Sequence, residues 1–408
     1  MSGHSTLGLA HRILKVLGLI ACVGIVAIGA LLASLWIEHR TPLTLPKPTG
    51  PFAVGRDVYD WADPHTVDVL APTPGAKREL LVWIWYPADA QSGRPDDYIP
   101  EALRRPAGPL VFRLLTRDLS KVHGHSLRDA RVSLQRHAYP VVIMRAGSSL
   151  EVATYSTLAE DLASHGYIVV GFDAPYRTFS VAFPDGRIIA RAPRNNPELV
   201  SGDEFVRRSN KLLAVWTSDI GFVLERLNWL NTSDPSGKFS SRLDMARVGV
   251  FGHSFGGAQA AEFCRQDSRC TAGIDIDGAL LDGVIREGIR KPFMFLVSGL
   301  GDFSSDADVR KFRGDIRSVY QRLPPDGRVW LSIRGANHFT FNDEGALLRS
   351  HVIRGVMHLF GQLGIDGRRQ LAVTAYCVHT FFDAYLKGPG VSRFSIDSSL
   401  YPEVDVVN

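Results

Sequence analysis

The chain has 408 residues, of which 45% are hydrophobic and 22% are charged, enough apolar sequence for one large domain or two ordinary ones. Its formal net charge is only +4, and its basic residues form no run longer than doublets such as Arg207 with Arg208. This composition gives no support for a role in binding nucleic acid.

One N-terminal segment differs from the rest of the chain. Residues 16–37 are apolar and uncharged, Arg12 and Lys15 precede them, and Glu38 follows. At a rise of about 1.5 Å per residue, a helix over this run can cross a bilayer core of about 30 Å. We expect a transmembrane anchor. Because the basic residues precede it, residues 1–15 should lie in the cytoplasm and the rest of the chain in a periplasmic or extracellular compartment.

Three other interpretations of the apolar run stay open. It could be a cleaved secretory signal, a lipoprotein signal, or the buried helix of a soluble protein. Residues 19–22, Leu-Ile-Ala-Cys, resemble a lipobox, but more apolar residues follow Cys22 where a polar tether is usual. Four prolines then predict an extended, semi-rigid linker over residues 38–51.

Residues 52–390 read as one catalytic domain in which short apolar strands alternate with helical stretches. This alternation predicts an α/β fold with a mostly parallel central sheet and helices on both faces. Residues 91–139 and 177–201 are expected to be insertions, the first carrying a helix or two, and residues 391–408 a polar tail. The expected strands cover residues 54–59, 66–70, 79–86, 141–144, 167–172, 248–251, 272–276, 293–297 and 329–333.

A nucleophile motif follows one of these strands. Gly252, His253, Ser254, Phe255 and Gly256 fit the pattern G-x-S-x-G, directly after a buried strand and at the start of a helical stretch. In this context the serine occupies a strained turn that exposes its hydroxyl group, and the glycines permit the close backbone contacts that such a turn needs. The motif alone is weak evidence, but its position between a strand and a helix favours a catalytic serine.

A serine hydroxyl needs a base, and the base needs a carboxylate to orient it. In α/β-hydrolases the chain order is serine, acid, histidine. His338 follows the expected strand at residues 329–333 and fits the base. Two carboxylates fit the acid: Asp277 ends the strand at 272–276, and Asp302 follows the next strand. In many α/β-hydrolases the acid follows the later of these two strands, which favours Asp302, but both carboxylates stay open at this point.

The developing oxyanion requires two preorganised backbone N–H groups. One should belong to Phe255, directly after the nucleophile. The other should come from the small-residue loop at 145–149, where we favour the Ser148 amide. Phe255, Phe339 and Phe341 are expected to line an apolar acyl pocket, although each could be an ordinary core residue.

The remaining reactive side chains predict little further chemistry. Cys264 and Cys270 could close a short disulfide loop if the domain is exported, or could simply be buried. His123, His125 and His137 lack partners at zinc-site spacing. We therefore expect neither a metal nor an organic cofactor.

Several short motifs occur in the order in which one known family has them. They lie at residues 78–82, 85–88, 155–160, 165–167, 252–257, 273–277, 337–343 and 381–388. Together they resemble the platelet-activating-factor acetylhydrolase family and its bacterial polyester- and dienelactone-hydrolase-like relatives, over residues 51–388.

This resemblance implies the α/β-hydrolase fold, a triad of Ser254, Asp277 and His338, and an oxyanion hole of the Ser148 and Phe255 amides. One departure is that the family often has His-Gly at the start of the oxyanion loop, whereas residues 146–147 here are Ala-Gly.

The expected function is hydrolysis of carboxylic esters through an acyl-enzyme. The substrates implied are small-molecule or lipid esters, such as short-acyl phospholipid-like or other amphiphilic esters. Lactones, dienelactones or polyesters are the alternative. A membrane-anchored binding protein that kept this fold without turnover is the alternative of another class.

Overall fold

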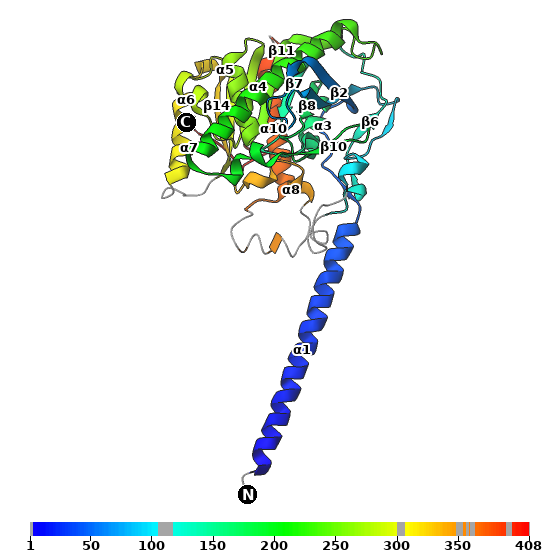
Figure 1. Ribbon diagram of the computed structural model, residues 1–408, viewed down its shortest axis with the longest axis vertical. Helices are drawn as coiled ribbons and strands as arrows, with labels where there is room; N and C mark the ends of the chain where they lie inside the picture. Colours follow the sequence, from blue (N-terminus) through cyan, green and yellow to red (C-terminus); the bar gives the residue numbers. More distant parts are fainter. Residues whose placement is uncertain are drawn as a thin grey trace.

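A mixed, 11-stranded sheet forms the centre of the fold (Figure 1). The computed structural model describes residues 3–104, 117–299, 307–347, 354–355, 359, 364–388 and 394–407. From β14 to β8 neighbouring strands run parallel, and antiparallel pairs extend the sheet at both edges. In spatial order the strands are β15 (Val404–Val406), β14 (Arg328–Arg334), β13 (Phe293–Gly299), β12 (Cys270–Ile276), β11 (Leu243–His253), β7 (Tyr139–Arg145), β8 (Ile168–Asp173), β3 (Lys77–Ala88), β2 (Ala53–Val67), β6 (Ser126–Arg128) and β4 (Arg94–Pro95).

Helices cover both faces of this sheet, and each face has its own apolar core. On one face the core includes residues of α3 and α10, and on the other it includes residues of α4 to α7. Because both faces are covered, central strands such as β7 and β8 are buried at every residue rather than alternating. The helices of these layers are α3 (Ser156–Ser164), α4 (Gly202–Ser233), α5 (Phe255–Gln266), α6 (Asp282–Glu287), α7 (Ala307–Tyr320) and α10 (Gly367–Leu386), with the short α8 (Glu344–Leu347) beside α10.

Two of the expected strands form a single strand. Two separate strands were expected at 54–59 and 66–70, but β2 is continuous from Ala53 to Val67. It pairs antiparallel with β3 along this length. The register of this pairing shifts between Asp63 and Val67, where the gap between the two expected strands ends.

The two expected insertions contain short elements. No α-helix occurs within the described part of residues 91–139, which contains β4, β6, η1 (Glu101–Leu103), η2 (Leu119–Lys121) and β5 (Val122–His123). Residues 177–201 form a hairpin of β9 (Ser180–Ala182) and β10 (Ile188–Ala190), followed by η4 (Pro193–Asn195) and η5 (Pro197–Leu199). In the segment assigned to a tail, β15 pairs with β14 at the sheet edge.

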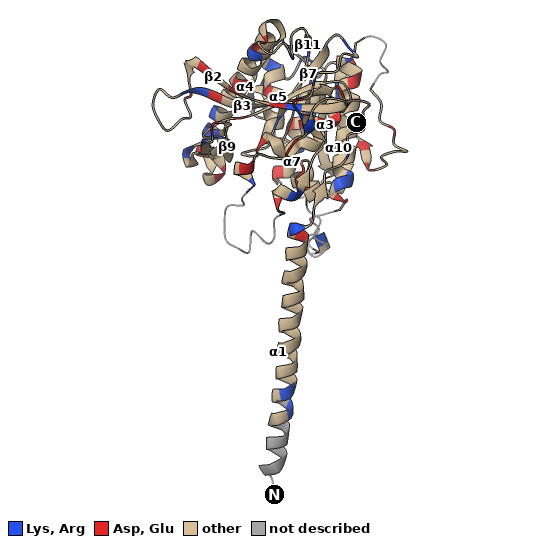
Figure 2. Cartoon of the chain, turned by 90° about the vertical axis from the view of Figure 1, so that its right-hand side faces the viewer, with Lys and Arg blue, Asp and Glu red and all other residues tan. Residues whose placement is uncertain are grey.

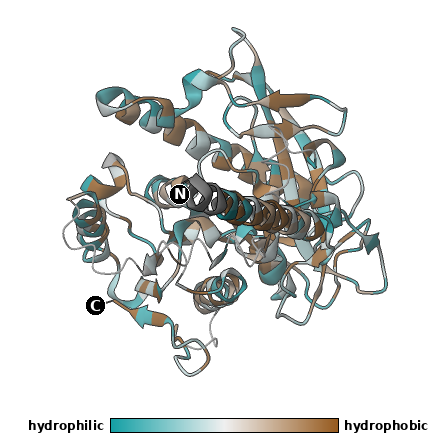
Figure 3. Ribbon diagram, turned by 90° about the horizontal axis from the view of Figure 1, so that it is seen from below, coloured by the Kyte–Doolittle hydropathy of each residue, from teal (hydrophilic) through white to brown (hydrophobic). Residues whose placement is uncertain are grey.

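A long helix, α1 (Gly3–Arg40), projects away from the sheet domain (Figure 1). Its stretch Leu14–Arg40 is long and apolar enough to cross a membrane, and no residue of the most apolar window is buried. Charged residues lie near its two ends and not along its middle (Figure 2), and the view from below colours much of the helix as hydrophobic (Figure 3). Length and composition alone do not separate an anchor from a signal sequence.

The segment after α1 is bound to the domain. The strand β1 (Leu43–Thr44) pairs with β5. Further along, Thr49 donates through its backbone N–H to Asp161 on α3, and the Phe52 N–H donates to the carbonyl oxygen of Ser164. These bonds hold the linker along the surface of the domain.

Candidate active site

Ser254 occupies the sharp turn between β11 and α5. Its backbone has φ 55° and ψ −123°, a conformation that is strained for a residue with a side chain. The Ser254 N–H donates to the Ile276 carbonyl oxygen at 2.8 Å. A Cβ atom on Gly252 would collide with the Gly256 backbone, and one on Gly256 with the Arg145 carbonyl group. Only glycine at these two positions permits so tight a turn.

Three predicted side chains form one hydrogen-bonded line. His338 Nε2 lies 3.1 Å from Ser254 Oγ, and His338 Nδ1 lies 2.8 Å from Asp277 Oδ2. Asp277 Oδ1 accepts from the Ser298 N–H at 2.8 Å and from the Ser298 hydroxyl at 3.0 Å. With its proton on Nδ1, His338 donates to Asp277 and can accept the serine proton at Nε2.

The environment of Asp277 favours its charged form. Burial alone would raise the pKa of this carboxyl, but the hydrogen bonds from His338 and from the Ser298 amide hold the pKa below its ordinary value. An ionised carboxylate can therefore stabilise a positive charge on His338. The other acid suggested by the sequence, Asp302, lies outside the described residues.

The two predicted oxyanion donors, the Ser148 and Phe255 amides, belong to residues that line one pocket. Within the described chain, neither amide is bonded to a protein acceptor. The Gly147 N–H donates to the Tyr155 hydroxyl at 3.0 Å, so it is already used. Ser148 and Phe255 thus keep donors free for a ligand.

Arg145 directly precedes residues 146–147, where this chain has Ala-Gly and the family often has His-Gly. Its side chain is buried, with its guanidinium carbon 3.7 Å from the Phe172 ring centroid and 4.3 Å from that of Trp216. Its Nε donates to Gln259 Oε1 on α5 at 2.8 Å. It thereby joins the end of β7 to α5, the helix that follows Ser254.

The buried His253 packs against His338. The His253 ring centroid lies 4.7 Å from that of His338, and His253 Nδ1 lies 2.7 Å from the Tyr155 hydroxyl. Burial, aided by His338, lowers the pKa of His253 to about 3, so this ring is neutral at physiological pH. No local sequence pattern identifies Tyr155 or Ser298 as part of the site, because both reach it through contacts with residues distant in sequence.

The phenylalanines proposed to line an acyl pocket have different environments. Phe341 is fully buried and packs against His253, with 5.6 Å between ring centroids. Phe339 is 71% exposed beside His338, and Phe255 lies on the pocket beside the oxyanion loop. Phe341 is therefore a core residue, whereas the other two can meet a ligand.

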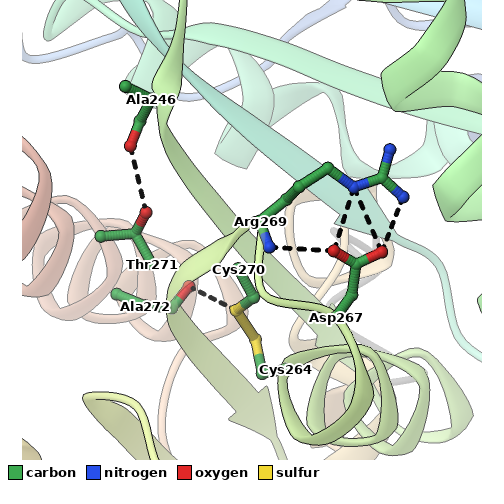
Figure 4. Close-up of a disulfide and its surroundings, with 7 residues drawn as sticks. All are labelled: Ala246, Cys264, Asp267, Arg269, Cys270, Thr271 and Ala272. Atoms are coloured by element: carbon green, nitrogen blue, oxygen red, sulfur yellow. Dashed lines mark hydrogen bonds and ion pairs between the residues drawn. A yellow bond between two sulfur atoms is a disulfide. The ribbon is translucent and has the colours of Figure 1, made fainter.

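Cys264 and Cys270 form a disulfide (Figure 4). It joins the last turn of α5 to the first residue of β12, across a turn in which Arg269 is paired with Asp267 at 2.6 Å. Ser254 precedes the opposite end of α5, so this link stabilises the helix without contacting the reactive side chains.

Two other features lie apart from these side chains. Asp161, His165 and His379 are the residues in the described ranges that are grouped closely enough to hold a metal ion. They already bind one another, with His379 Nδ1 2.9 Å from Asp161 Oδ2. A pocket of about 950 Å³, bounded by residues such as Phe52 and Lys238, includes none of the reactive side chains.

Comparison with known proteins reveals related esterases. A family model described as platelet-activating factor acetylhydrolase, isoform II, matches residues 215–387. A probable 1-alkyl-2-acetylglycerophosphocholine esterase from Arthroderma benhamiae is 26% identical over 393 residues, covering 88% of this chain and 92% of the relative. A platelet-activating factor acetylhydrolase from Cavia porcellus is 26% identical over 331 residues, covering 74% of this chain and 69% of the relative.

A solved structure extends the likeness to the fold. The ferulic acid esterase from Streptomyces cinnamoneus superposes with a TM-score of 0.73 at 29% identity, covering 90% of this chain and 100% of that one. Fold and relatives define this chain as an esterase with the α/β-hydrolase fold. The resemblance to the platelet-activating-factor acetylhydrolase family, predicted from the sequence motifs, is confirmed.

Proposed function

We propose that this protein is a serine carboxylic-ester hydrolase in which Ser254 is the nucleophile, His338 the general base and Asp277 the residue that orients His338. The observation that supports this best is the continuous contact from Ser254 Oγ through His338 to Asp277, on a strained turn at the start of a helix. The helix N-terminus adds partial positive charge next to the reacting oxygen.

The reaction then runs in two halves. His338 takes the proton of Ser254 Oγ as the oxygen attacks the ester carbonyl, and the Ser148 and Phe255 amides donate to the oxyanion. The C–O bond to the alcohol breaks, and His338 gives the proton to that alcohol. Water attacks the acyl-enzyme with the same histidine as base, which releases the acid and restores the serine hydroxyl.

The names of the relatives suggest two substrate groups. A glycerophosphocholine esterase and acetylhydrolases support short-acyl, phospholipid-like esters as the first choice. A ferulic acid esterase of the same fold supports esters of aromatic acids as the second. We further propose that α1 anchors the chain in a membrane with the catalytic domain outside the cytoplasm, as its apolar length supports.

Turnover by the full-length chain tests the proposal. The substrates are p-nitrophenyl acetate, butyrate and octanoate, a 2-acetyl glycerophosphocholine and methyl ferulate. We expect Ser254→Ala to remove all turnover and all labelling by a fluorophosphonate, whereas Ser233→Ala, at the exposed end of α4, keeps both. A folded wild-type chain that neither hydrolyses these esters nor reacts with the fluorophosphonate would contradict the proposal and favour a binding protein.

A further inference from the structure

Tyr155 lies where two segments of the candidate active site meet. It ends the short helix η3 (Val152–Tyr155), directly before α3, and it is buried. Its hydroxyl accepts from the Gly147 N–H in the oxyanion loop at 3.0 Å and lies 2.7 Å from Nδ1 of His253, the residue before Ser254. One phenol oxygen therefore joins the oxyanion loop to the turn that bears the nucleophile.

The direction of these two hydrogen bonds follows from the groups that form them. A backbone amide can only donate, so the Gly147 N–H occupies a lone pair of the phenol oxygen and leaves the phenol proton for His253. Burial raises the pKa of Tyr155, so this proton stays on its oxygen, and the His253 ring is neutral because burial lowers its pKa. His253 Nδ1 is then the acceptor, and the hydrogen bonds run in one chain from Gly147 through Tyr155 to His253.

The oxyanion loop is packed closely against this pair. A Cβ atom on Gly147 would lie 3.2 Å from the Tyr155 hydroxyl oxygen and 3.3 Å from His253 Nδ1. The next peptide group carries the Ser148 N–H, the predicted oxyanion donor, and the Gly147 carbonyl oxygen of that group accepts from the Leu150 N–H at 3.2 Å. Because the peptide group is planar and Gly147 is bonded through both its N–H and its carbonyl, the Ser148 N–H has a fixed direction.

The backbone on both sides of Tyr155 is bonded to Asp343, in the segment that follows His338. The first two N–H groups of α3 donate to the Asp343 carboxylate at 3.0 and 3.1 Å. The Asp343 N–H donates to the Thr154 carbonyl oxygen at 2.8 Å. The phenol group is therefore held in place by a backbone that is itself anchored beside the base.

We propose that Tyr155 is a positioning residue for the oxyanion hole: its hydroxyl fixes Gly147, and with it the Ser148 amide, against the turn that bears Ser254. It acts on the reacting atoms only through its bonded neighbours. A donor that is already aligned lowers the barrier, because nothing has to reorganise as the charge develops. This inference rests on the proposed esterase function and adds a residue to the machinery of the same site.

The variant Tyr155→Phe tests this on the full-length chain, because it removes only the phenol oxygen. Acylation and deacylation each form an oxyanion that uses the same donors. We therefore expect kcat for p-nitrophenyl butyrate to fall about 10- to 100-fold, with KM within about threefold of wild type. The inhibition constant of a trifluoromethyl ketone, which forms a tetrahedral adduct with a catalytic serine, should rise by a similar factor.

Tyr139→Phe is the matched control. Tyr139 is also buried, and its hydroxyl donates to the Ser133 carbonyl oxygen at 3.0 Å, at the opposite end of β7 from the oxyanion loop. This variant loses a buried hydrogen bond of the same kind, so its melting temperature should fall about as much as that of Tyr155→Phe. It should keep the kcat and the inhibition constant of wild type, whereas a purely structural role of Tyr155 would make the two variants alike.

The pH profile of kcat/KM separates an effect on the oxyanion donor from an effect on the base. His253 packs against His338, so a displaced His253 ring would shift the acid limb of the profile, which reports the base. A misaligned Ser148 amide lowers kcat/KM by one factor at every pH and leaves that limb in place, and this is the result that we expect for Tyr155→Phe.

The outcomes distinguish this inference from the function on which it rests. If Tyr155→Phe turns over within about twofold of wild type, if its loss lies in KM, if the acid limb shifts, or if Tyr139→Phe loses as much, Tyr155 does not position the oxyanion donor, while the esterase stands. If wild type hydrolyses no ester and the fluorophosphonate does not react, the esterase proposal fails and this inference fails with it.

Discussion

Two buried carboxyl groups lie two residues apart at the end of β12, and their surroundings shift their pKa values in opposite directions. Asp277 has a pKa below its ordinary value, because hydrogen bonds from His338 and Ser298 overcome the effect of burial. Burial raises the pKa of Asp275 well above its ordinary value, despite the hydrogen bond from the Gly278 amide. The charged form is therefore favoured at Asp277 and disfavoured at Asp275, so Asp277 is the carboxyl group suited to stabilise a protonated His338.

This difference predicts unequal effects of the same substitution. Asp277→Asn should lower kcat by about 10⁴-fold, because the amide no longer holds the imidazole in its productive tautomer or stabilises its charge. Asp275→Asn replaces a carboxyl group whose charged form is disfavoured by burial with a neutral amide of similar shape, and we expect turnover within about tenfold of wild type. The measurement is kcat for p-nitrophenyl acetate, with the melting temperature of each variant recorded to exclude unfolding.

Two results would contradict this prediction. If Asp277→Asn folds and retains turnover, Asp277 is not the acid, and Asp302 should be substituted next. If Asp275→Asn loses as much turnover as Asp277→Asn while both stay folded, the different roles assigned to the two carboxyl groups are wrong.

The residues of the site could be predicted from the sequence only where a short motif or a neighbouring strand identifies them. Ser254 was predicted from a short motif between a strand and a helix, and His338 from its place after a late strand. The local pattern could not choose between Asp277 and Asp302, since both follow strands that end at one edge of the sheet. The contact of Ser298 with Asp277 depends on β13 lying beside β12, which no local pattern encodes.

At the scale of elements, the linker meets α3 and α10 through a small polar cluster. The Thr49 hydroxyl donates to Asp161 Oδ1 at 2.7 Å and lies 2.9 Å from His165 Nε2. The His165 and His379 rings are stacked with their centroids 3.9 Å apart. Burial, together with the neighbouring His379, lowers the pKa of His165 to about 4 from its ordinary 6.5.

This shift makes folding stability depend on pH. The unfolded chain binds a proton at His165 below about pH 6.5, whereas the folded chain binds it only near pH 4. The contribution of neutral His165 to the free energy of unfolding is therefore fully present above pH 6.5. It is lost as the pH falls towards 4, and about 2 kcal/mol of it is lost at pH 5. We expect His165→Gln to reduce the fall in unfolding free energy between pH 7.5 and pH 5 by about this amount.

Urea unfolding of wild type and variant at both pH values measures this difference. Other groups, including the buried His253, contribute equally to both proteins and cancel. An unchanged pH dependence in His165→Gln would show that His165 titrates normally in the folded chain and that the cluster has no part in acid sensitivity.

The disulfide predicts a second effect at this scale. Cys264 and Cys270 are separated by 6 positions, and closing so short a loop in the unfolded chain is worth about 2 kcal/mol. We expect a reducing agent to lower the melting temperature of wild type, and the double variant Cys264→Ala, Cys270→Ala to melt at a similarly low temperature and to ignore the reductant. If the melting temperature of wild type is the same with and without the reductant, the disulfide does not stabilise the fold.

At the scale of the whole molecule, the layered sheet could be predicted because buried parallel strands are apolar along their whole length. The strands at the edges of the sheet and the position of the linker could not be predicted in this way. β15 is only three residues long and gains stability by pairing with β14. The linker is polar and proline-rich in sequence, yet it binds the domain through contacts such as β1 with β5. Both depend on surfaces that exist only after the central strands have assembled.

The bound linker also fixes where α1 leaves the domain. Arg117 Nη1 donates to the Glu38 carbonyl at the end of α1 at 2.7 Å, and its Nε donates to the Leu347 carbonyl at 3.0 Å. Leu347 ends α8, which follows the His338 turn. On the proposal that α1 spans a membrane, the edge of the sheet that bears Ser254 therefore lies on the side of the domain nearest the bilayer.

This arrangement predicts that α1 matters for one kind of substrate. Removing residues 1–30 exposes no core surface, because the apolar window of α1 is not buried. We expect the shortened chain to hydrolyse soluble p-nitrophenyl acetate as wild type does, but to lose at least about tenfold in rate on a 2-acetyl phospholipid embedded in vesicles that carry the protein, since anchoring raises the local concentration of site and substrate. Comparing both rates for full-length and shortened chains at equal protein concentration measures this. Equal rates on vesicles would show that α1 does not direct the site to the bilayer, and a matching loss on the soluble ester would instead indicate that α1 supports the folded domain.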